Sequence, residues 1–398
     1  MGSVKIGSGK DQPYYSRRVK RVRRQGIDAA ALDGRPRQRP RLVINSPPPL
    51  RPVSPVRPVL LIPELIWPEP GDELTLGKLA TPGLDWLLAH AEPARGARQG
   101  YEAALLEAGG LTRHAFGALR LLGEADGGIA RDGHWLCADP VHLRFHHGRI
   151  VLADAGAFDL DESDAQALVA ALNAEFAELG QFHASTAKRW YLRLHAAVDH
   201  VAEPISAVAG RRMNSELDGK ASPLRRWLNE IQMFLHVHPV NARRQAAGLP
   251  AVNSLWLWGG GELPAPPSRH SAVCADDPLA RDLALAAGIP ARPVPATLAD
   301  LLAGDAGPAP LVVLDSLLPP VLYEDGAAWR EAMLQLDRDW FAPLRRALGR
   351  GVDGVTLIAP TIYGTLSCTV EAGERWKFWK KGRPLADRAR ELAEGNTP

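Results

Sequence analysis

The strongest constraint on the fold is an alternation of short apolar runs and amphipathic runs after Pro250. The runs "NSLWLWGGG", "LVVLDSL" and "GVTLIAPT" are typical of buried strands, and "DDPLARDLALAAG" and "AAWREAMLQLDRDWFAPLRRALGRG" are typical of helices. Such alternation favours a mostly parallel sheet flanked by helices, because each crossover helix covers one face of the sheet. An earlier run, "PVLLIPELIW", predicts a further buried strand. The sequence therefore predicts an α/β core.

The middle of the chain has a different pattern. The stretch "GHWLCADPVHLRFHHGRIVLADAGAFDL" alternates as hairpin strands do, with His-Gly at the expected turn. The stretch "DESDAQALVAALNAEFAELG" predicts an amphipathic helix that Asp161 or Ser163 caps. A longer helix follows, and we expect Pro239 to interrupt it. These features predict an inserted α+β domain.

Both ends of the chain are expected to lie outside the folded part. Residues 1–57 carry 14 basic and 3 acidic side chains and are rich in Arg and Pro, so they are expected to be a disordered basic tail. Such a tail could bind nucleic acid through its charge, but we favour a solvated tail because no aromatic or helical pattern accompanies the arginines. Residues 386–398 are expected to be a short C-terminal tail.

Cysteine usage and hydropathy limit the location. The three cysteines, Cys137, Cys274 and Cys368, lie far apart and match no metal-binding or disulfide spacing. No apolar run reaches the roughly 18 residues that a membrane span requires. The sequence therefore predicts a cytoplasmic protein with no membrane partner.

Short motifs with chemical potential are weak when each is taken alone. His236 and His238 are two residues apart, and on a helix they would point to different sides, which does not suit one metal ion. The glycines of "WLWGGG" could approach an anion, but no Walker lysine and no GxGxxG spacing accompany them. A flexible exit from a strand is the alternative explanation.

Four carboxylates are candidates for site residues because they follow strands or lie in helices: Asp139, Asp154, Asp315 and Asp337. Asp315 in "VVLDS" would lie at the carboxyl end of a strand, where sites form in open α/β sheets. The sequence leaves open which of the four meet.

Two blocks, "DPVHLRFHHGRIVLADAG" and "WLNEIQMFLHVHPVNARRQAAGLPAVNSLWLWGGG", resemble the RpfE-type regulatory protein family. That family is distantly similar to archaeal-type cofactor-independent phosphoglycerate mutases of the alkaline phosphatase superfamily. The resemblance covers about residues 58–385. It implies an alkaline-phosphatase-like α/β core formed by residues 58–123 and 251–385, interrupted by a cap domain at 124–250.

The resemblance also implies which catalytic groups to look for. Enzymes of that superfamily use two divalent metals, Asp and His ligands, and a Ser or Thr nucleophile. Here the corresponding strands read "LLIPELIW", "VVLDSLLPP" and "IAPTIYGT", and Arg113-His114-Ala115 stands at the nucleophile step. We therefore expect no catalytic residues, no metal ligands and no cofactor. A weaker site formed by Glu64, Asp72, Asp315 and His114 remains the alternative.

The residues that match the family's motifs on the cap side are Arg144, His238, Asn241 and Arg244, with Asn253 in the linker. Arg and His beside Asn can hold a phosphate or a carboxylate, which predicts binding of a phosphorylated or carboxylate small molecule. Structural roles are the alternative: Asn241 would cap or break the helix, Arg244 would pair with an acid, and Asn253 would tie the linker.

The preferred interpretation is a non-catalytic regulatory or ligand-binding protein, with a possible protein partner, on a phosphoglycerate-mutase-like fold. The alternative is a metal-dependent mutase or phosphatase with a rearranged site that uses Mn or Zn. The stretch "WKFWKKGRP" near the C-terminus could be a partner-binding patch, although a helix that packs on the core is preferred.

Overall fold

The computed structural model describes residues 55–394 apart from 113–114, 147–148, 199–201, 209–211, 214–223, 266, 268 and 383. All of these residues belong to one compact unit that comprises residues 52–398. The predicted disorder of residues 1–54, the expected turn at 147–148 and the position Arg113-His114 lie outside the described residues. Residues 55–57 were assigned to the basic tail, but Val56 is buried and forms a bridge with Val352.

A seven-stranded sheet forms the core, in the order β10-β9-β11-β1-β12-β13-β2. Its first five strands are parallel: β10 (Ala291–Arg292), β9 (Val273–Cys274), β11 (Leu311–Val313), β1 (Val59–Leu61) and β12 (Gly354–Thr361). The strands are short and rich in Val, Leu and Ile because parallel sheets are buried on both faces. The two remaining strands, β13 (Gly364–Glu371) and β2 (Glu92–Gly96), are antiparallel. This mixed, mostly parallel sheet confirms the predicted fold class.

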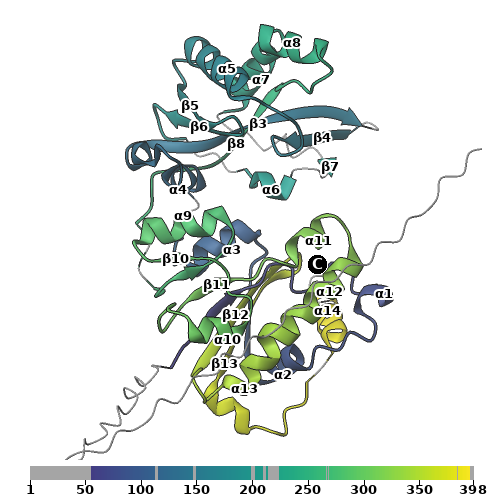
Figure 1. Ribbon diagram of the computed structural model, residues 1–398. Helices are drawn as coiled ribbons and strands as arrows, with labels where there is room; N and C mark the ends of the chain where they lie inside the picture. The colour runs from purple at the N-terminus through teal and green to yellow at the C-terminus, as the bar shows by residue number, and fades with distance from the viewer. Residues whose placement is uncertain are drawn as a thin grey trace, which may run out of the picture. The chain divides into compact units, whose positions relative to one another are not determined.

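Helices cover both faces of the core sheet (Figure 1). Leu60 packs in one buried cluster and its neighbour Leu61 in another, as the alternation of side chains along a strand requires. The first cluster includes side chains of α2 (Pro82–His90), α10 (Leu298–Ala303), α12 (Gly326–Leu336), α13 (Ala342–Ala347) and α14 (Leu385–Glu394). The second includes side chains of α3 (Tyr101–Ala108), α4 (Phe116–Leu122) and α9 (Pro278–Ala287).

The long helix expected over residues 327–351 is divided. After α12 the chain winds as a π-helix over Asp337–Phe341 before α13 begins. The Asp337 carboxylate, buried there, accepts the backbone N–H groups of Gly83 at 3.2 Å and Leu84 at 2.7 Å, and so caps the start of α2. Two short helices complete this part: α1 (Glu73–Leu76) and α11 (Leu318–Leu322).

A second sheet is built from antiparallel pairs in the order β5-β6-β3-β4-β7, with β8 also paired to β3. Its strands are β3 (His134–His146), β4 (Arg149–Asp154), β5 (Gly180–Thr186), β6 (Arg189–Leu194), β7 (Arg212–Met213) and β8 (Ser254–Gly261). One buried cluster joins this sheet to α5 (Glu162–Glu175), α7 (Arg225–His236) and α8 (Pro239–Ala246). A short helix, α6 (Ile205–Val208), lies in the connection from β6 to β7.

Local signals placed the helix ends of this region well. Asp161 is the N-cap of α5 and accepts the backbone N–H of Asp164 at 2.8 Å. The helix after residue 224 is interrupted as expected, because α7 ends at His236 and Pro239 opens α8.

Two expected segment assignments need correction. The run Ser254–Gly261 was assigned to the core, but β8 pairs with β3 in the second sheet, so the chain returns to the core sheet only after it. Residues 386–394 were expected to be tail, but they continue α14, where Leu385 and Ala389 are buried. None of the described helices is both long and apolar enough to cross a bilayer.

Candidate functional site

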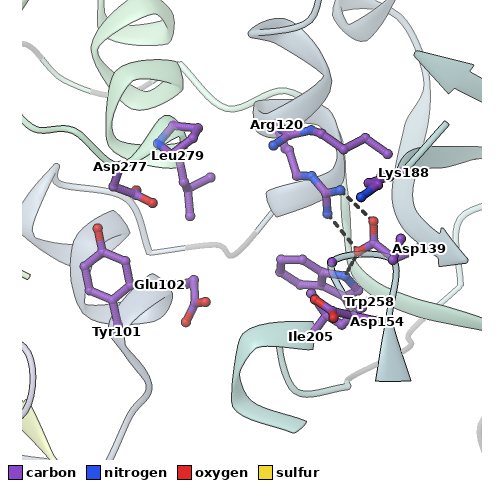
Figure 2. A pocket seen from close by; sticks show the side chains of 14 residues that line it. Tyr101, Glu102, Arg120, Asp139, Asp154, Lys188, Ile205, Trp258, Asp277 and Leu279 are labelled. Carbon is purple, nitrogen blue, oxygen red and sulfur yellow. Dashed lines mark hydrogen bonds and ion pairs between the residues drawn. The ribbon is translucent and has the colours of Figure 1, made fainter. Parts of the chain in front are cut away.

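A cavity of about 260 Å³ lies between residues of the core and residues of the second sheet (Figure 2). Figure 2 shows Tyr101, Glu102, Asp277 and Leu279 along one side and Arg120, Asp139 and Trp258 along the other. Ligands of α/β proteins commonly bind beyond the carboxyl ends of the parallel strands, and the segment after β9 supplies part of this wall.

Two acids stand on the core side of the cavity. Asp277 is the N-cap of α9 and accepts the backbone N–H of Ala280 at 2.9 Å. Glu102, in the first turn of α3, accepts a hydrogen bond from the hydroxyl of Ser206. Burial raises the pKa of both carboxyl groups. This wall therefore presents two carboxyl groups that are partly shielded from water.

The opposite wall centres on a buried ion pair. Arg120 of α4 donates to Asp139 of β3 through Nη1 at 2.8 Å and Nη2 at 2.5 Å. The indole Nε1 of Trp258 donates to the same carboxylate at 2.8 Å. Asp139 is 3 % exposed, so these donors are what stabilises its charge inside the protein.

A second ion pair continues this network. Arg189 donates to Glu124 through Nε, and the hydroxyl of Tyr191 donates to the same carboxylate oxygen at 2.6 Å. The guanidinium of Arg120 also lies 5.5 Å from the centre of the Tyr191 ring. Both arginines of the cavity wall are thus already paired with carboxylates.

Besides Glu102 and Asp277, two further charged groups of the cavity wall have no ion-pair partner among the described residues. They are the ammonium of Lys188, in the turn between β5 and β6, and the carboxylate of Asp154, at the end of β4. Lys188 is exposed and Asp154 is half-buried. These two side chains are therefore available to a ligand.

One further acid lies close to this network. Asp282 of α9 is 7 % exposed, and its side chain packs against Gly123, where an added Cβ would lie 1.7 Å from Oδ1. Burial raises the pKa of Asp282 to about 7, which the charge of Arg189 partly opposes. Gly123 is thus a position where the backbone approaches a carboxylate closely.

The cap-side residues predicted to bind a ligand do not line this cavity. The buried amide of Asn241 donates to the carbonyls of Leu235 at 2.7 Å and Val252 at 2.8 Å, and accepts the N–H of Val252 at 2.9 Å. Arg244 is 3 % exposed and bonds to Asp164 at 3.1 Å. Both side chains have the structural roles that were the alternative, except that Asn241 is not a helix cap.

The other three predicted residues are also separate from the cavity wall. His238 is the N-cap of α8, where Nδ1 accepts the N–H of Val240 at 3.3 Å. Asn253 bonds to the backbone N–H and C=O of Leu143, each at 2.8 Å. Arg144 is exposed on β3. A binding role for these residues remains a prediction, and the structure brings them to no common pocket.

The glycines of "WLWGGG" have a packing role. Gly259 has φ +65°, and a Cβ there would lie 2.6 Å from the Cβ of Phe116. A Cβ on Gly261 would lie 2.5 Å from the Cβ of Ala115. These glycines let β8 approach the start of α4, which agrees with the structural explanation better than with an anion site.

Backbone hydrogen bonds and a turn shape the ends of the core strands at which the sequence predicts no metal ligands. After β1, Glu64 has φ +57° and its carbonyl accepts the indole N–H of Trp329 at 3.0 Å. After β12, the chain reverses into β13 through a turn in which Thr361 donates to the carbonyl of Gly364 at 2.8 Å. Asp72, a member of the alternative site, is the N-cap of α1. Within the described residues, no three His, Cys, Asp or Glu side chains group as metal ligands would.

Sequence interpretation found only part of the cavity. Asp139 and Asp154 were among the four candidate carboxylates, and both line it. Arg120, Lys188 and Asp277 were missed, because they come from segments that are far apart in sequence and carry no motif. The step "VCADDP", in which a short apolar run ends in two acids just before a predicted helix, was a local signal for Asp277.

Comparisons with known proteins address the fold. No family model matches the chain. A 2,3-bisphosphoglycerate-independent phosphoglycerate mutase from Methanothrix thermoacetophila is 30 % identical over 93 residues, which are 23 % of this chain and 24 % of that protein. The match thus spans about a quarter of the curated relative.

Two solved structures are similar over most of their length. The PH0037 protein from Pyrococcus horikoshii aligns with a TM-score of 0.51 at 14 % identity, over 86 % of this chain and 96 % of that chain. A cofactor-independent phosphoglycerate mutase from Thermoplasma acidophilum aligns with a TM-score of 0.45 at 18 % identity, over 83 % and 94 %. The likeness to PH0037 shows a shared fold, and the local sequence match supports its description as phosphoglycerate-mutase-like. The chain thus has a phosphoglycerate-mutase-like α/β fold with a mostly parallel sheet flanked by helices.

Proposed function

We propose that the chain is a non-catalytic ligand-binding protein of regulatory type, similar to the RpfE-type family, on a phosphoglycerate-mutase-like fold. The support is the replacement of metal ligands and nucleophile at the strand ends, together with the turn that connects β12 directly to β13. A cytoplasmic location is part of this proposal, and the three buried free cysteines are consistent with a reducing compartment.

The observation that carries the proposal is a cavity whose wall holds, among the described residues, one cation and three acids without an ion-pair partner. Because Arg120 and Arg189 are neutralised by Asp139 and Glu124, an anionic ligand would find its free partner in Lys188. The acids Asp154, Glu102 and Asp277 would repel a ligand that is only anionic and favour one that also carries a cationic or hydrogen-bond-donating group. We therefore narrow the expected phosphorylated or carboxylate ligand to one that also bears an amine.

Phosphoserine and 3-phosphoglycerate provide a matched pair of probes, because they differ in an ammonium against a hydroxyl on the same carbon skeleton. We expect phosphoserine to bind at least about tenfold more tightly in calorimetric titrations of the purified protein, a ratio that corresponds to about 1.4 kcal/mol. Lys188→Ala should weaken the binding of both ligands, whereas Asp154→Asn should selectively weaken the binding of phosphoserine. Equal affinities, or binding unaffected by both substitutions, would overturn the assignment of the cavity.

The alternative function is a metal-dependent mutase or phosphatase with a rearranged site. One observation favours it: burial raises the pKa of Glu102 and Asp277, and perturbed acids in a cleft are typical of catalytic sites. The two functions separate in an assay of 3-phosphoglycerate and p-nitrophenyl phosphate turnover with added Mn²⁺ or Zn²⁺. We expect no turnover above buffer; turnover that is lost on Asp277→Asn would establish the enzyme instead.

A further inference from the structure

The connection from β13 to α14 displays three aromatic side chains on the surface. Trp376 is 70 % exposed, Phe378 is 88 % exposed and Trp379 is 64 % exposed. We call residues 375–381 the aromatic loop; it belongs to the yellow part of the ribbon that precedes α14 (Figure 1). A helix that packs on the core was expected here, but a short 3-10 helix, η4 (Ala372–Trp376), ends at Trp376, and α14 begins only at Leu385. Large apolar side chains that gather on a surface commonly mark a binding site.

Hydrogen bonds of a side chain and a backbone carbonyl anchor the aromatic loop to the core. The carbonyl of Lys377 bonds to Nε2 of the buried His90 at 3.1 Å, and Arg375 donates to the carbonyl of Leu348 at 3.1 Å. Within the loop, the N–H of Phe378 bonds to the carbonyl of Trp376 at 3.0 Å. The rings are therefore presented by a supported turn, and they do not fold back onto the core.

Basic side chains surround these rings. Lys377 and Lys380 share Glu374 as their partner, and the neighbouring Lys381 is exposed with no ion pair to a described residue. The ring of Trp86, stacked on His90 at 4.0 Å, carries the guanidinium of Arg345 at 5.4 Å. Further exposed cations are Arg346 and Arg350, on either side of Leu348. The acids near the loop are Asp85, Asp353, Glu374 and Glu371, of which Glu371 pairs with Arg57. Cations outnumber acids around the loop.

We propose that the aromatic loop docks the protein on an anionic lipid surface. Trp and Phe favour the boundary between headgroups and acyl chains, and lysines beside them meet anionic headgroups. A lipid surface accepts three protruding rings at once, whereas a protein partner would need a pocket for each. The basic residues 1–57 would be attracted by the same charge. This surface association differs from a membrane span and revises the expectation of no membrane partner.

Sedimentation of the full chain with vesicles tests the proposal. Vesicles of phosphatidylcholine with about 30 mol % phosphatidylserine should bind the protein at low salt, and vesicles of phosphatidylcholine alone should bind it far less. The variant Trp376→Ala/Phe378→Ala/Trp379→Ala should lose at least about tenfold in vesicle affinity. Tyr323→Ala, which removes an 83 % exposed aromatic from the end of α11, is the matched control and should bind as the unaltered chain does.

Depth-dependent quenching separates insertion from charge attraction alone. Brominated lipids should quench part of the tryptophan fluorescence of the unaltered chain, and the triple variant should lose this quenching while its circular dichroism spectrum is retained. Vesicle binding that is unchanged in the triple variant would overturn the proposal and assign the attraction to the basic residues. Tight binding of an acidic polypeptide without vesicle binding would assign the loop to a protein partner.

Discussion

The two sheets differ in how they use buried charge. The core cluster around Leu60 is apolar, and buried polar side chains near it, such as His90 and Asp337, bond to backbone groups. The second sheet, its helices α5 and α8 and the end of α4 hold paired charges: Arg120 with Asp139, Arg189 with Glu124, and Arg244 with Asp164. The core is thus stabilised mainly by apolar burial, whereas the second sheet also depends on buried ion pairs in which both partners are present.

This difference matters for function because the cavity borders the charged region. Removing one partner of a buried ion pair leaves an uncompensated charge, whereas trimming an apolar side chain leaves only a cavity. The second sheet should therefore respond to the removal of single charges more strongly than the core sheet. Hydrogen exchange measured by mass spectrometry can report the two regions separately, which a single unfolding temperature cannot.

The largest loss of folding stability is expected for Arg120→Ala. It leaves the carboxylate of Asp139 with only the Trp258 indole as a donor, at a cost of about 3–5 kcal/mol. Hydrogen exchange should accelerate in β3 and β8 and change less in β1 and β12. Arg120→Ala/Asp139→Ala, which removes the stranded charge, should be less destabilised than the sum of the two single variants. Additive effects would show that the pair is not coupled.

A smaller loss of folding stability is expected for Asn241→Ala. Its amide makes three hydrogen bonds to backbone groups of Leu235 and Val252, and their removal leaves buried groups unsatisfied at about 1–3 kcal/mol. Exchange should increase around α8 while affinity for the cavity ligand stays unchanged. A selective loss of ligand affinity with unchanged exchange would instead support the binding role predicted from the sequence.

A pH-dependent effect is expected for Asp282→Asn. Because the folded-state pKa of Asp282 is raised to about 7 from 3.8, the folded state holds the proton more tightly than the unfolded state. Its contribution to stability is full below the unfolded pKa and is lost as the pH rises through about 7. The variant should therefore gain about 1–3 kcal/mol relative to the unaltered chain between pH 5 and pH 8.

Thermal unfolding at those two pH values measures this gain. Asp305→Asn is the control, since the side chain of Asp305 is 96 % exposed and its replacement should change stability little. A difference between Asp282→Asn and the unaltered chain that is the same at both pH values would indicate that Asp282 titrates normally.

The smallest effect is expected for Arg144→Ala. Arg144 is exposed on β3 and forms no side-chain ion pair or hydrogen bond with another described residue, so stability should change by less than about 0.5 kcal/mol. Affinity for the cavity ligand should also be unchanged, because Arg144 does not line the cavity. Calorimetric titration checks this point, and a marked loss of affinity would restore Arg144 as a binding residue.

Sequence reasoning succeeded where a feature depends on neighbours in the chain. Pro239 interrupts a helix, Asp161 caps one, and the apolar runs at residues 59–61, 311–313 and 354–361 are strands of a parallel sheet. These features follow from local sterics, capping and periodicity, which a linear sequence displays directly. The α/β class follows from the same signals.

Strand partners could not be predicted in this way. The apolar run Ser254–Gly261 would be buried in the core sheet or in the second sheet, so its composition does not distinguish the two. Its pairing with β3 assigns it to the second sheet. The roles of Asn241, Arg244 and Asn253 depended likewise on which carbonyls and carboxylates lie beside them. A polar residue matched to a motif has the same sequence signature whether it binds a ligand or a backbone.

By itself, the sequence determined the mostly parallel sheet and several of the helix boundaries. Only the tertiary structure decided the cavity, because its wall takes Glu102, Arg120, Asp139, Lys188 and Asp277 from five separate segments. The physical reason is that periodicity and capping act over a few residues, whereas charge pairing and desolvation act through space, between side chains that folding brings together.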